Sequence, residues 1–131
     1  MIFGVGVDII EIERIAASYE RFGERFALRI LAKREFESFQ TRSARSAGRG
    51  LAFLSTRFAA KEAVAKALGL GMRSPMRWHA VEILNEPSGR PRVTVHGELR
   101  RFVEHNRLQL HVSLTDERRT AVAYAIAEVV E

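Results

Sequence analysis

Three charged residues have the types and spacing needed to hold a metal ion and a phosphate. Asp8 follows the apolar segment "FGVGV", and Glu62 and Lys66 lie one helical turn apart in "RFAAKEAVAKALG", residues 57–69. A carboxylate at the end of an apolar strand is costly to bury unless it is paired or bound to a cation. Magnesium typically takes one or two protein carboxylates and completes its octahedron with phosphate oxygens and water. The three residues therefore indicate a magnesium–phosphoryl site, with Lys66 neutralising charge on the phosphate.

The same residues also have ordinary structural interpretations. Asp8 could cap a helix that begins just after it. A glutamate four residues before a lysine is a common decoration of a solvated helix face, and such a pair stabilises a helix by only a few tenths of a kcal/mol. The pattern of residues 57–69 predicts a helix capped by Ser55 or Thr56 and ended by Gly69. Taken alone, the segment favours the ordinary structural interpretation, so the case for a functional site depends on the rest of the chain.

Two arginines extend the candidate site. Arg49 and Arg57 flank the expected start of this helix. Helix N-termini favour anions, and guanidinium groups bind phosphate in a bidentate manner. We therefore expect a second phosphate of the ligand to bind here.

The hydrophobic patterns predict one α+β domain spanning residues 1–131. They indicate a strand over 3–10, a helix beginning just after Asp8, a helix over 24–41 broken near 32–33, a loop over 41–50, the helix of 57–69, a hairpin over 78–97, a helix over 98–107, and strands over 108–115 and 120–130. One strand, then helices, then a strand-rich second half favours α+β over a doubly wound sheet.

Composition limits the classes of partner and chemistry. The 131 residues carry a net charge of +5 with 21 lysines and arginines, which favours an anionic partner. There are no cysteines, so disulfides, zinc thiolates and thiol catalysis are excluded, and a cytoplasmic location is expected. Acids interrupt the apolar N-terminus, which is neither a signal peptide nor a membrane span. The four histidines show no metal-ligand spacing, so structural roles are expected for them.

Two motifs resemble the signatures of a known family. "GVGVDIIEIERI" and "RFAAKEAVAKALG" are similar to the two signature motifs of the holo-acyl-carrier-protein synthases, the small bacterial 4′-phosphopantetheinyl transferases. The likeness continues through Trp78, "VEILNEPSGRPRV" and "LHVSLTDERRTAVAYAIAE" and spans nearly the whole chain. This resemblance implies magnesium-dependent transfer of the phosphopantetheine arm of coenzyme A to a serine of acyl carrier protein, with release of 3′,5′-ADP, in fatty acid biosynthesis. It also implies the family's fold, an antiparallel sheet with helices packed on it, in a homotrimer whose active sites lie between subunits.

The resemblance also implies roles for single residues. Asp8 and Glu62 match the family's magnesium ligands, and Lys66 matches the lysine near the pyrophosphate. Arg49 and Arg57 match residues that hold the 3′-phosphate of coenzyme A. The turn beside the nucleotide is Gly89, Arg90 and Pro91, with arginine in place of the family's lysine. The carrier-protein docking surface corresponds to Arg14, Arg21, Arg25, Phe26 and Arg29.

Two positions depart from the family pattern. Many members carry Ser-x-[Ser/Thr]-His on the penultimate strand, and this chain ends that sequence with Asp116, so a candidate general base is absent. The family's Gly-Thr-Gly after the helix is Gly-Leu-Gly here, at residues 69–71, which removes a hydroxyl contact to the ligand. Glu62, acting directly or through a water, is the expected base for the serine.

Two rival functions use part of the same pattern. A basic nucleic-acid-binding module would use the positive charge and the arginine-rich segment 41–50. It leaves Asp8 and Glu62 without a role and has no recognisable reading motif, so we expect neither nucleic acid nor membrane as a partner. An inactive homologue kept for assembly is the second rival, and an activity assay separates it from the enzyme.

Overall fold

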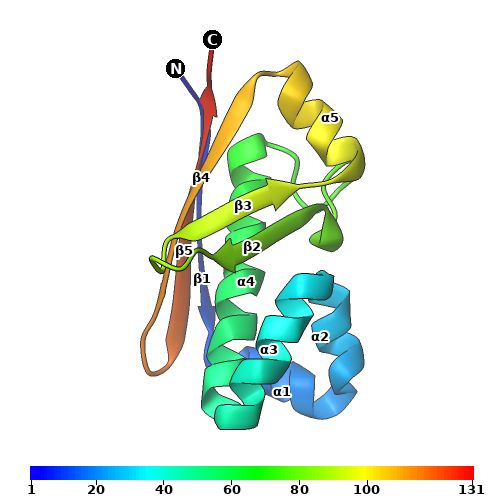
Figure 1. Cartoon of the computed structure of the whole chain (residues 1–131), viewed down its shortest axis with the longest axis vertical. Helices are drawn as coiled ribbons and strands as arrows, with labels where there is room; N and C mark the ends of the chain where they lie inside the picture. The colour runs from blue at the N-terminus through cyan, green and yellow to red at the C-terminus, as the bar shows by residue number, and fades with distance from the viewer.

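The long helix α4 (Ala47–Leu68) is the centre around which the chain folds (Figure 1). The computed structural model describes residues 1–131. The other elements, in chain order, are β1 (Ile2–Glu11), α1 (Ile12–Phe22), α2 (Glu24–Ile30), α3 (Lys33–Arg45), the single 3₁₀ turn η1 (Trp78–Ala80), β2 (Val81–Asn85), β3 (Pro91–Val95), α5 (Gly97–His105), β4 (Leu108–Asp116) and β5 (Thr120–Val129). This order confirms the α+β prediction.

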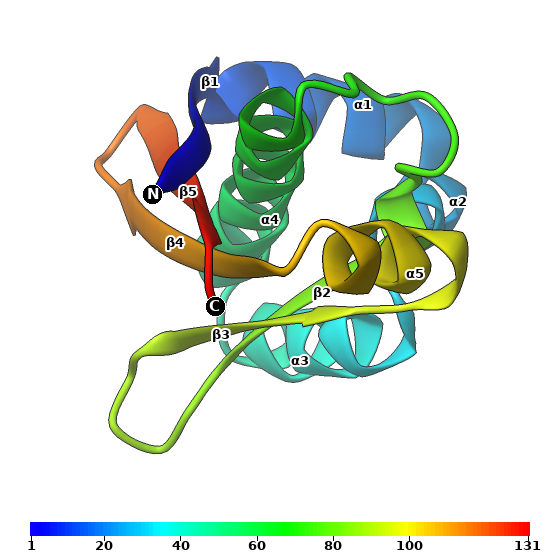
Figure 2. The same ribbon diagram turned by 90° about the horizontal axis from the view of Figure 1, so that it is seen from above.

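The strands form two separate antiparallel sheets. The first has the strand order β1-β5-β4, and the second is the hairpin of β2 and β3. Asp8 lies opposite Ala123 in the β1–β5 register, and Val81 lies opposite Val95 in the hairpin. Seen from above, the three-stranded sheet and the hairpin lie on different sides of α4 (Figure 2). The helix is therefore enclosed, and fourteen of its 22 residues are buried.

Small residues allow α4 to lie very close to the sheet. A Cβ atom on Gly4 would overlap the backbone oxygen of Ala67, and one on Gly6 would overlap that of Ala63. Every second residue of β5 on the same side is a fully buried alanine: Ala121, Ala123, Ala125 and Ala127. The "GVG" segment thus serves close packing of a helix on a strand. Because α4 packs so tightly here, side chains of β1 just beyond the glycines come within reach of those on the helix.

The structure corrects two predicted boundaries. The first helix begins at Ile12, not just after Asp8, because β5 provides pairing partners for β1 as far as Glu11. Asp8 therefore lies within a strand and cannot cap a helix. The expected loop over 41–50 is almost entirely helical, since α3 continues to Arg45 and α4 begins at Ala47.

Ser46, rather than Ser55 or Thr56, caps α4. Its backbone is extended, at φ −164°, and its side chain accepts a hydrogen bond from the backbone N–H of Arg49 at 3.4 Å. The helix ends as predicted at Gly69, which adopts the left-handed conformation with φ 74°. None of the helices combines the length and the apolar character required to cross a bilayer.

Candidate active site

Asp8 and Lys66 meet where β1 crosses α4. Alternate residues of β1 face the helix, and Asp8 shares that face with Gly6 and with Ile10, which is buried. The Nζ atom of Lys66 lies 3.3 Å from Oδ1 of Asp8 and donates to the backbone oxygen of Val7 at 2.9 Å. Lys66 is thus paired across two elements and forms no ion pair with Glu62 within its own helix. The interpretation of Glu62 and Lys66 as an ion pair on the surface of one helix is therefore wrong.

Glu62 lies beside this pair in a setting that disfavours its charge. Partial burial raises the pKa of the Glu62 carboxyl above its usual value, and the negative charge of Asp8 raises it further, whereas Lys66 lowers it. The two carboxylates are therefore near enough to repel each other. A cation placed between them would remove that repulsion.

These residues fit a magnesium ion that is shared with a ligand. Nowhere does the structure gather three or more histidine, cysteine, aspartate or glutamate side chains that could hold a metal by themselves. Asp8 and Glu62 supply two carboxylates, which matches the usual protein share of a magnesium site completed by phosphate oxygens and water. Lys66 stands next to them with half of its side chain exposed and can contact the same phosphates.

Arg57 lies on the other side of α4, against the hairpin. Its guanidinium donates to the backbone oxygen of Ile83 at 3.0 Å and to Oδ1 of Asn85 at 3.1 Å, and it lies 4.0 Å from the centre of the Phe53 ring. Burial lowers the pKa of Arg57 to about 10, so the group remains charged at neutral pH. With only 3% of the residue exposed, Arg57 offers little surface to a ligand in a single chain.

Arg49 lies in the first turn of α4, eight residues before Arg57, so the expectation that the two arginines flank the helix start is wrong. Arg49 lines a hollow of about 510 Å³ together with Arg118 and Asp116. Asp116, which stands where many family members have histidine, thus lines the same hollow as two arginines. The start of α4 lines this hollow. Of the two arginines predicted to lie at the helix start, only Arg49 is found there.

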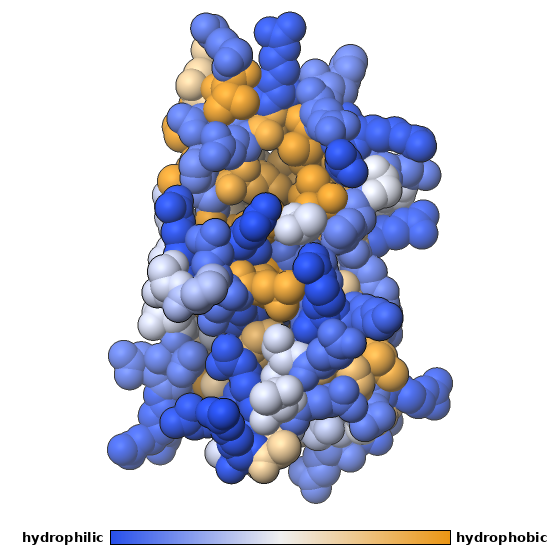
Figure 3. All heavy atoms as spheres, in the orientation of Figure 1, coloured by the Kyte–Doolittle hydropathy of each residue, from blue (hydrophilic) through white to orange (hydrophobic).

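The turn of the hairpin borders a second hollow. Gly89 is at φ 91°, a conformation that favours glycine, and the backbone of Glu86 and Arg90 closes the turn with a bond of 2.8 Å. Arg90 and Pro91 line a hollow of about 440 Å³ between the hairpin and β4. Figure 3 shows apolar atoms gathered over this part of the surface, with hydrophilic atoms around them.

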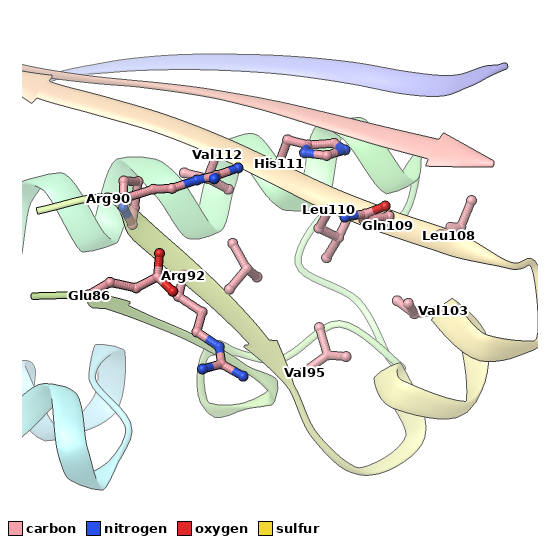
Figure 4. A pocket seen from close by; sticks show the side chains of 12 residues that line it. Glu86, Arg90, Arg92, Val95, Val103, Leu108, Gln109, Leu110, His111 and Val112 are labelled. Atoms are coloured by element: carbon pink, nitrogen blue, oxygen red, sulfur yellow. The ribbon is translucent and has the colours of Figure 1, made fainter. Parts of the chain in front are cut away.

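The lining of this second hollow has an apolar base and a polar rim. In the close view of Figure 4, Arg90 reaches from the hairpin toward β4, and Leu110 points into the space between the strands. Glu86 and Arg92 stand on the hairpin side of the rim. An opening of this size with aliphatic walls and cationic edges suits a flat organic ring that carries phosphates.

The predicted site residues thus form two groups on different sides of α4. Asp8, Glu62 and Lys66 lie on the side of β1, whereas Arg57 and the turn at 89–91 lie on the side of the hairpin. One chain does not bring the metal group and the nucleotide group together around a single ligand.

The predicted docking residues occupy two consecutive helices. Helix α1 extends to Phe22, so Arg14 and Arg21 lie on one helix two turns apart, as the sequence required for a shared face. Arg25 and Arg29 lie one turn apart on α2, with Phe26 half-buried beside them. All four arginines are exposed, and none forms an ion pair. Phe22, which was not among the predicted docking residues, is also exposed, beneath the guanidinium of Arg21.

Sequence reasoning missed a buried ion pair next to the metal group. Nζ of Lys61 lies 2.6 Å from Oε1 of Glu35, and both side chains are fully buried. The pattern of charges gave no sign of it, because Lys61 and Glu35 are 26 residues apart and each has nearer residues of opposite charge. Burial lowers the pKa of Lys61, whereas the charge of Glu35 raises it.

Known proteins match this chain over its whole length. Residues 4–126 match the model of the 4′-phosphopantetheinyl transferase superfamily. A holo-[acyl-carrier-protein] synthase of Herminiimonas arsenicoxydans is 54% identical over 128 residues, which cover 98% of each chain. The crystal structure of the synthase from Neisseria meningitidis has a TM-score of 0.89 and 35% identity, covering 98% of this chain and 99% of the other. That of Bacillus anthracis, solved in complex with coenzyme A (3′,5′-ADP), has a TM-score of 0.82 and 29% identity and covers 99% of both chains. The chain therefore belongs to the 4′-phosphopantetheinyl transferase superfamily, within the family of the holo-[acyl-carrier-protein] synthases.

Proposed function

We propose that this protein transfers the 4′-phosphopantetheine arm of coenzyme A to a serine of apo-acyl carrier protein, giving holo-acyl carrier protein and 3′,5′-ADP. The observation that carries this proposal is the convergence of Asp8, Glu62 and Lys66 where β1 crosses α4. Two carboxylates that repel each other beside an exposed lysine suit a metal-bound pyrophosphate. Family membership names the reaction, and this geometry provides the groups that the reaction needs.

The reaction forms a bond between the serine oxygen and the β-phosphorus and breaks the bond from that phosphorus to the oxygen that leaves with 3′,5′-ADP. Asp8 and Glu62 would hold Mg²⁺, which when bound supplies electrophilic stabilisation of the pyrophosphate oxygens. Lys66 binds a phosphate oxygen and offsets the charge that develops on the leaving group. Glu62 takes the serine proton, directly or through a water.

The second group of residues would bind the nucleotide of coenzyme A. Arg49, which lines the hollow at the start of α4, would contact the 3′-phosphate, and the buried Arg57 would add positive charge beside it. Gly89, Arg90 and Pro91 would border the base. The aliphatic hollow beside Arg90 supports this assignment, because its size and cationic rim suit a purine with phosphates attached. Arg57 retains its charge at neutral pH, which favours an anion near it.

A homotrimer with active sites between subunits would unite the two groups. An exposed apolar row supports this assembly: Val5, Val7 and Ile9 on the outer face of β1 are 52%, 53% and 65% exposed. Tyr124, opposite Val7 in the sheet, continues the row. A continuous apolar sheet face of this kind typically marks an interface between proteins. A neighbouring chain on this face would bring its nucleotide group toward Asp8 and Glu62.

The exposed arginines of α1 and α2 would bind the carrier protein. Acyl carrier proteins are acidic, and Arg14, Arg21, Arg25 and Arg29 are all without carboxylate partners of their own. We place this protein in the cytoplasm, as part of fatty acid biosynthesis, which consumes holo-acyl carrier protein. Phe26 would supply an apolar contact between the charged ones.

Product release tests this proposal. Purified protein is incubated with coenzyme A, Mg²⁺ and apo-acyl carrier protein, and 3′,5′-ADP is measured by chromatography. A carrier protein with alanine in place of the acceptor serine serves as the matched control. We expect release with the serine form only. Equal release with both forms would mean hydrolysis of coenzyme A rather than transfer.

A further inference from the structure

Helix α2 is too short to be stable by itself. It has seven residues, whereas isolated helices below about 12–15 residues are marginal in water. Its last carbonyl groups have no partners within the helix, and Leu31, which follows it, is extended at φ −97° and ψ 131°, so no glycine cap closes the end. Yet α2 carries three residues of the proposed docking surface. Contacts from outside the helix must therefore set its position.

Two side chains from other elements bind the end of α2. The backbone N–H of Ala32, which would donate to Leu28 in a longer helix, donates to Oε1 of Glu35 at 2.9 Å instead. Nε2 of His79 donates to the freed oxygen of Leu28 at 2.6 Å. Nζ of Lys61 donates to the oxygen of Ile30 at 2.7 Å. A cation at the end of a helix also complements the helix dipole.

His79 and Lys61 are joined through η1. Nζ of Lys61 also donates to the backbone oxygen of Trp78 at 2.7 Å, and the Trp78 ring stacks on Phe58 of α4 at 5.0 Å. Residue 78 is thus fixed to α4, while residue 79 is fixed to α2. Both ribbon views show α2 beside the turn that precedes β2 (Figures 1 and 2). The 3₁₀ turn η1 thus connects α2 to α4.

Through Lys61, the end of α2 is also connected to Glu62, one of the proposed metal ligands. Lys61 precedes Glu62 directly, and its ammonium is held by Glu35, whose Oε2 accepts from the backbone N–H of Ile83 at 2.7 Å. Every polar atom of the Glu35–Lys61 pair is satisfied, so the pair fixes its surroundings without cost from an unpaired charge. The end of α2 is thereby set relative to the helix turn that presents Glu62.

We propose that His79 and Lys61 are positioning residues that hold the docking helix α2 in a fixed position relative to the active site. The proposal rests on the proposed carrier-protein function of α2. Neither side chain needs to touch the carrier protein. They act by fixing the last turn of α2, which presents Arg25, Phe26 and Arg29. When α2 is loosened, only the fraction of molecules with the helix in place binds the carrier protein well, so its apparent affinity falls.

His79→Ala is the most informative variant, because His79 is exposed and its loss leaves no buried charge. His79→Gln is the rescue variant, since the glutamine Nε2 can donate from a similar position. His105→Ala is the matched control, an exposed histidine on α5 without a hydrogen bond to α2. All four proteins, including the wild type, are studied by hydrogen exchange and by steady-state kinetics with both substrates.

Hydrogen exchange of α2 is expected to be faster in His79→Ala alone. The Michaelis constant for carrier protein is expected to rise about three- to tenfold in that variant, the scale of one lost hydrogen bond. The constant for coenzyme A should stay within a factor of about two, and His79→Gln should restore most of the loss. Lys61→Met combined with Glu35→Gln, which avoids a lone buried charge, should also speed hydrogen exchange of α2.

Arg29→Ala separates failure of this inference from failure of the docking assignment. If Arg29→Ala raises the carrier-protein constant and His79→Ala changes neither exchange nor that constant, the positioning role is wrong and the docking surface stands. If His79→Ala speeds exchange but neither variant alters carrier-protein use, α2 is not the docking helix and the inference falls with it. Equal effects of His79→Ala on both substrates would also overturn it.

Discussion

Lys66 forms its ion pair with Asp8 on β1, at 3.3 Å, rather than with Glu62 one turn away on its own helix. The pair joins two elements that glycines at positions 4 and 6 bring into close contact. Glu62 is left beside Asp8 without an ion pair of its own. Burial and the charge of Asp8 raise its pKa, and Lys66 only partly offsets that rise. The arrangement is poor as a stabilising device, because Lys66 is half exposed and the pair is screened by water. It is suited to a ligand that brings a metal ion and phosphates.

Loss of either carboxylate should abolish most activity without unfolding the protein. We expect Asp8→Asn and Glu62→Gln each to lower kcat by roughly a hundredfold or more, the scale of losing a group that stabilises developing charge. Glu11→Gln, an exposed carboxylate on the same strand, is the matched control and should retain activity. Circular dichroism should be unchanged in all three variants. A Glu62→Gln enzyme with near-normal kcat would remove Glu62 from the reaction.

The pKa of Glu62 gives a test that does not depend on activity. In metal-free protein, a carboxyl titration followed by nuclear magnetic resonance should place this pKa above the ordinary glutamate value. Asp8→Asn should lower it by removing a nearby negative charge, and Lys66→Met should raise it. Because a proton competes with the cation, magnesium affinity should weaken as the pH falls through this pKa. An unchanged value in both variants would mean that the three groups do not interact.

Gly6→Ala should destabilise the fold strongly. A Cβ atom there meets the backbone of Ala63, which cannot move away as a side-chain tip could. We expect a loss of about 1–3 kcal/mol in the free energy of unfolding, the range for overpacked cores. Gly48→Ala is the control, because the nearest atom to its new Cβ, Oγ of Ser46, is 3.6 Å away. Chemical denaturation of both variants measures the difference, and equal stability would show that β1 has room to shift.

Local patterns predicted most of the fold, and the failures have physical causes. The break between α2 and α3, the hairpin and the two last strands are confirmed. Helical spacing from Ile9 to Ile15 predicted too early a helix, because pairing with β5 extends β1 to Glu11. The segment 41–50 is polar and basic, yet it is helical, since Ser46 alone interrupts the two helices. Local polarity does not reveal such tertiary and capping effects.

The candidate site was predictable only in part. Residue types and spacing selected Asp8, Glu62 and Lys66 as one group, the resemblance supported that selection, and the structure places Asp8 and Lys66 in contact with Glu62 beside them. The expected position of Arg57 near a helix start was wrong, because α4 begins ten residues earlier, at Ala47. Neither the buried Glu35–Lys61 pair nor the contact from His79 to α2 could be foreseen, because both join residues far apart in the sequence.

The outer face of β1 should control assembly. Val5→Glu places a charge in the exposed apolar row without touching the core, so the single chain should keep its secondary structure. We expect light scattering at micromolar concentration to show a trimer for the wild type and a monomer for the variant. Activity should be lost with the trimer, because the metal and nucleotide groups then stay apart. A monomeric variant with full activity would refute the shared site.

Arg14 should affect one substrate only. Truncating a central interfacial charge commonly costs about 2–5 kcal/mol, whereas exposed rim charges mainly set encounter rates. We expect Arg14→Ala to raise the Michaelis constant for carrier protein strongly and to leave that for coenzyme A nearly unchanged. Rising salt should weaken carrier-protein use in the same selective way. If Arg14→Ala instead impaired coenzyme A use alone, the docking surface would lie elsewhere.

The most direct test of the central claim is the intact mass of the carrier protein after incubation with this protein, coenzyme A and Mg²⁺. The account predicts that apo-acyl carrier protein gains the mass of one phosphopantetheine arm on its serine. The gain should disappear in excess chelator and should be nearly absent with Asp8→Asn or Glu62→Gln. An unmodified carrier protein in the complete mixture, or full modification in excess chelator, would contradict the account.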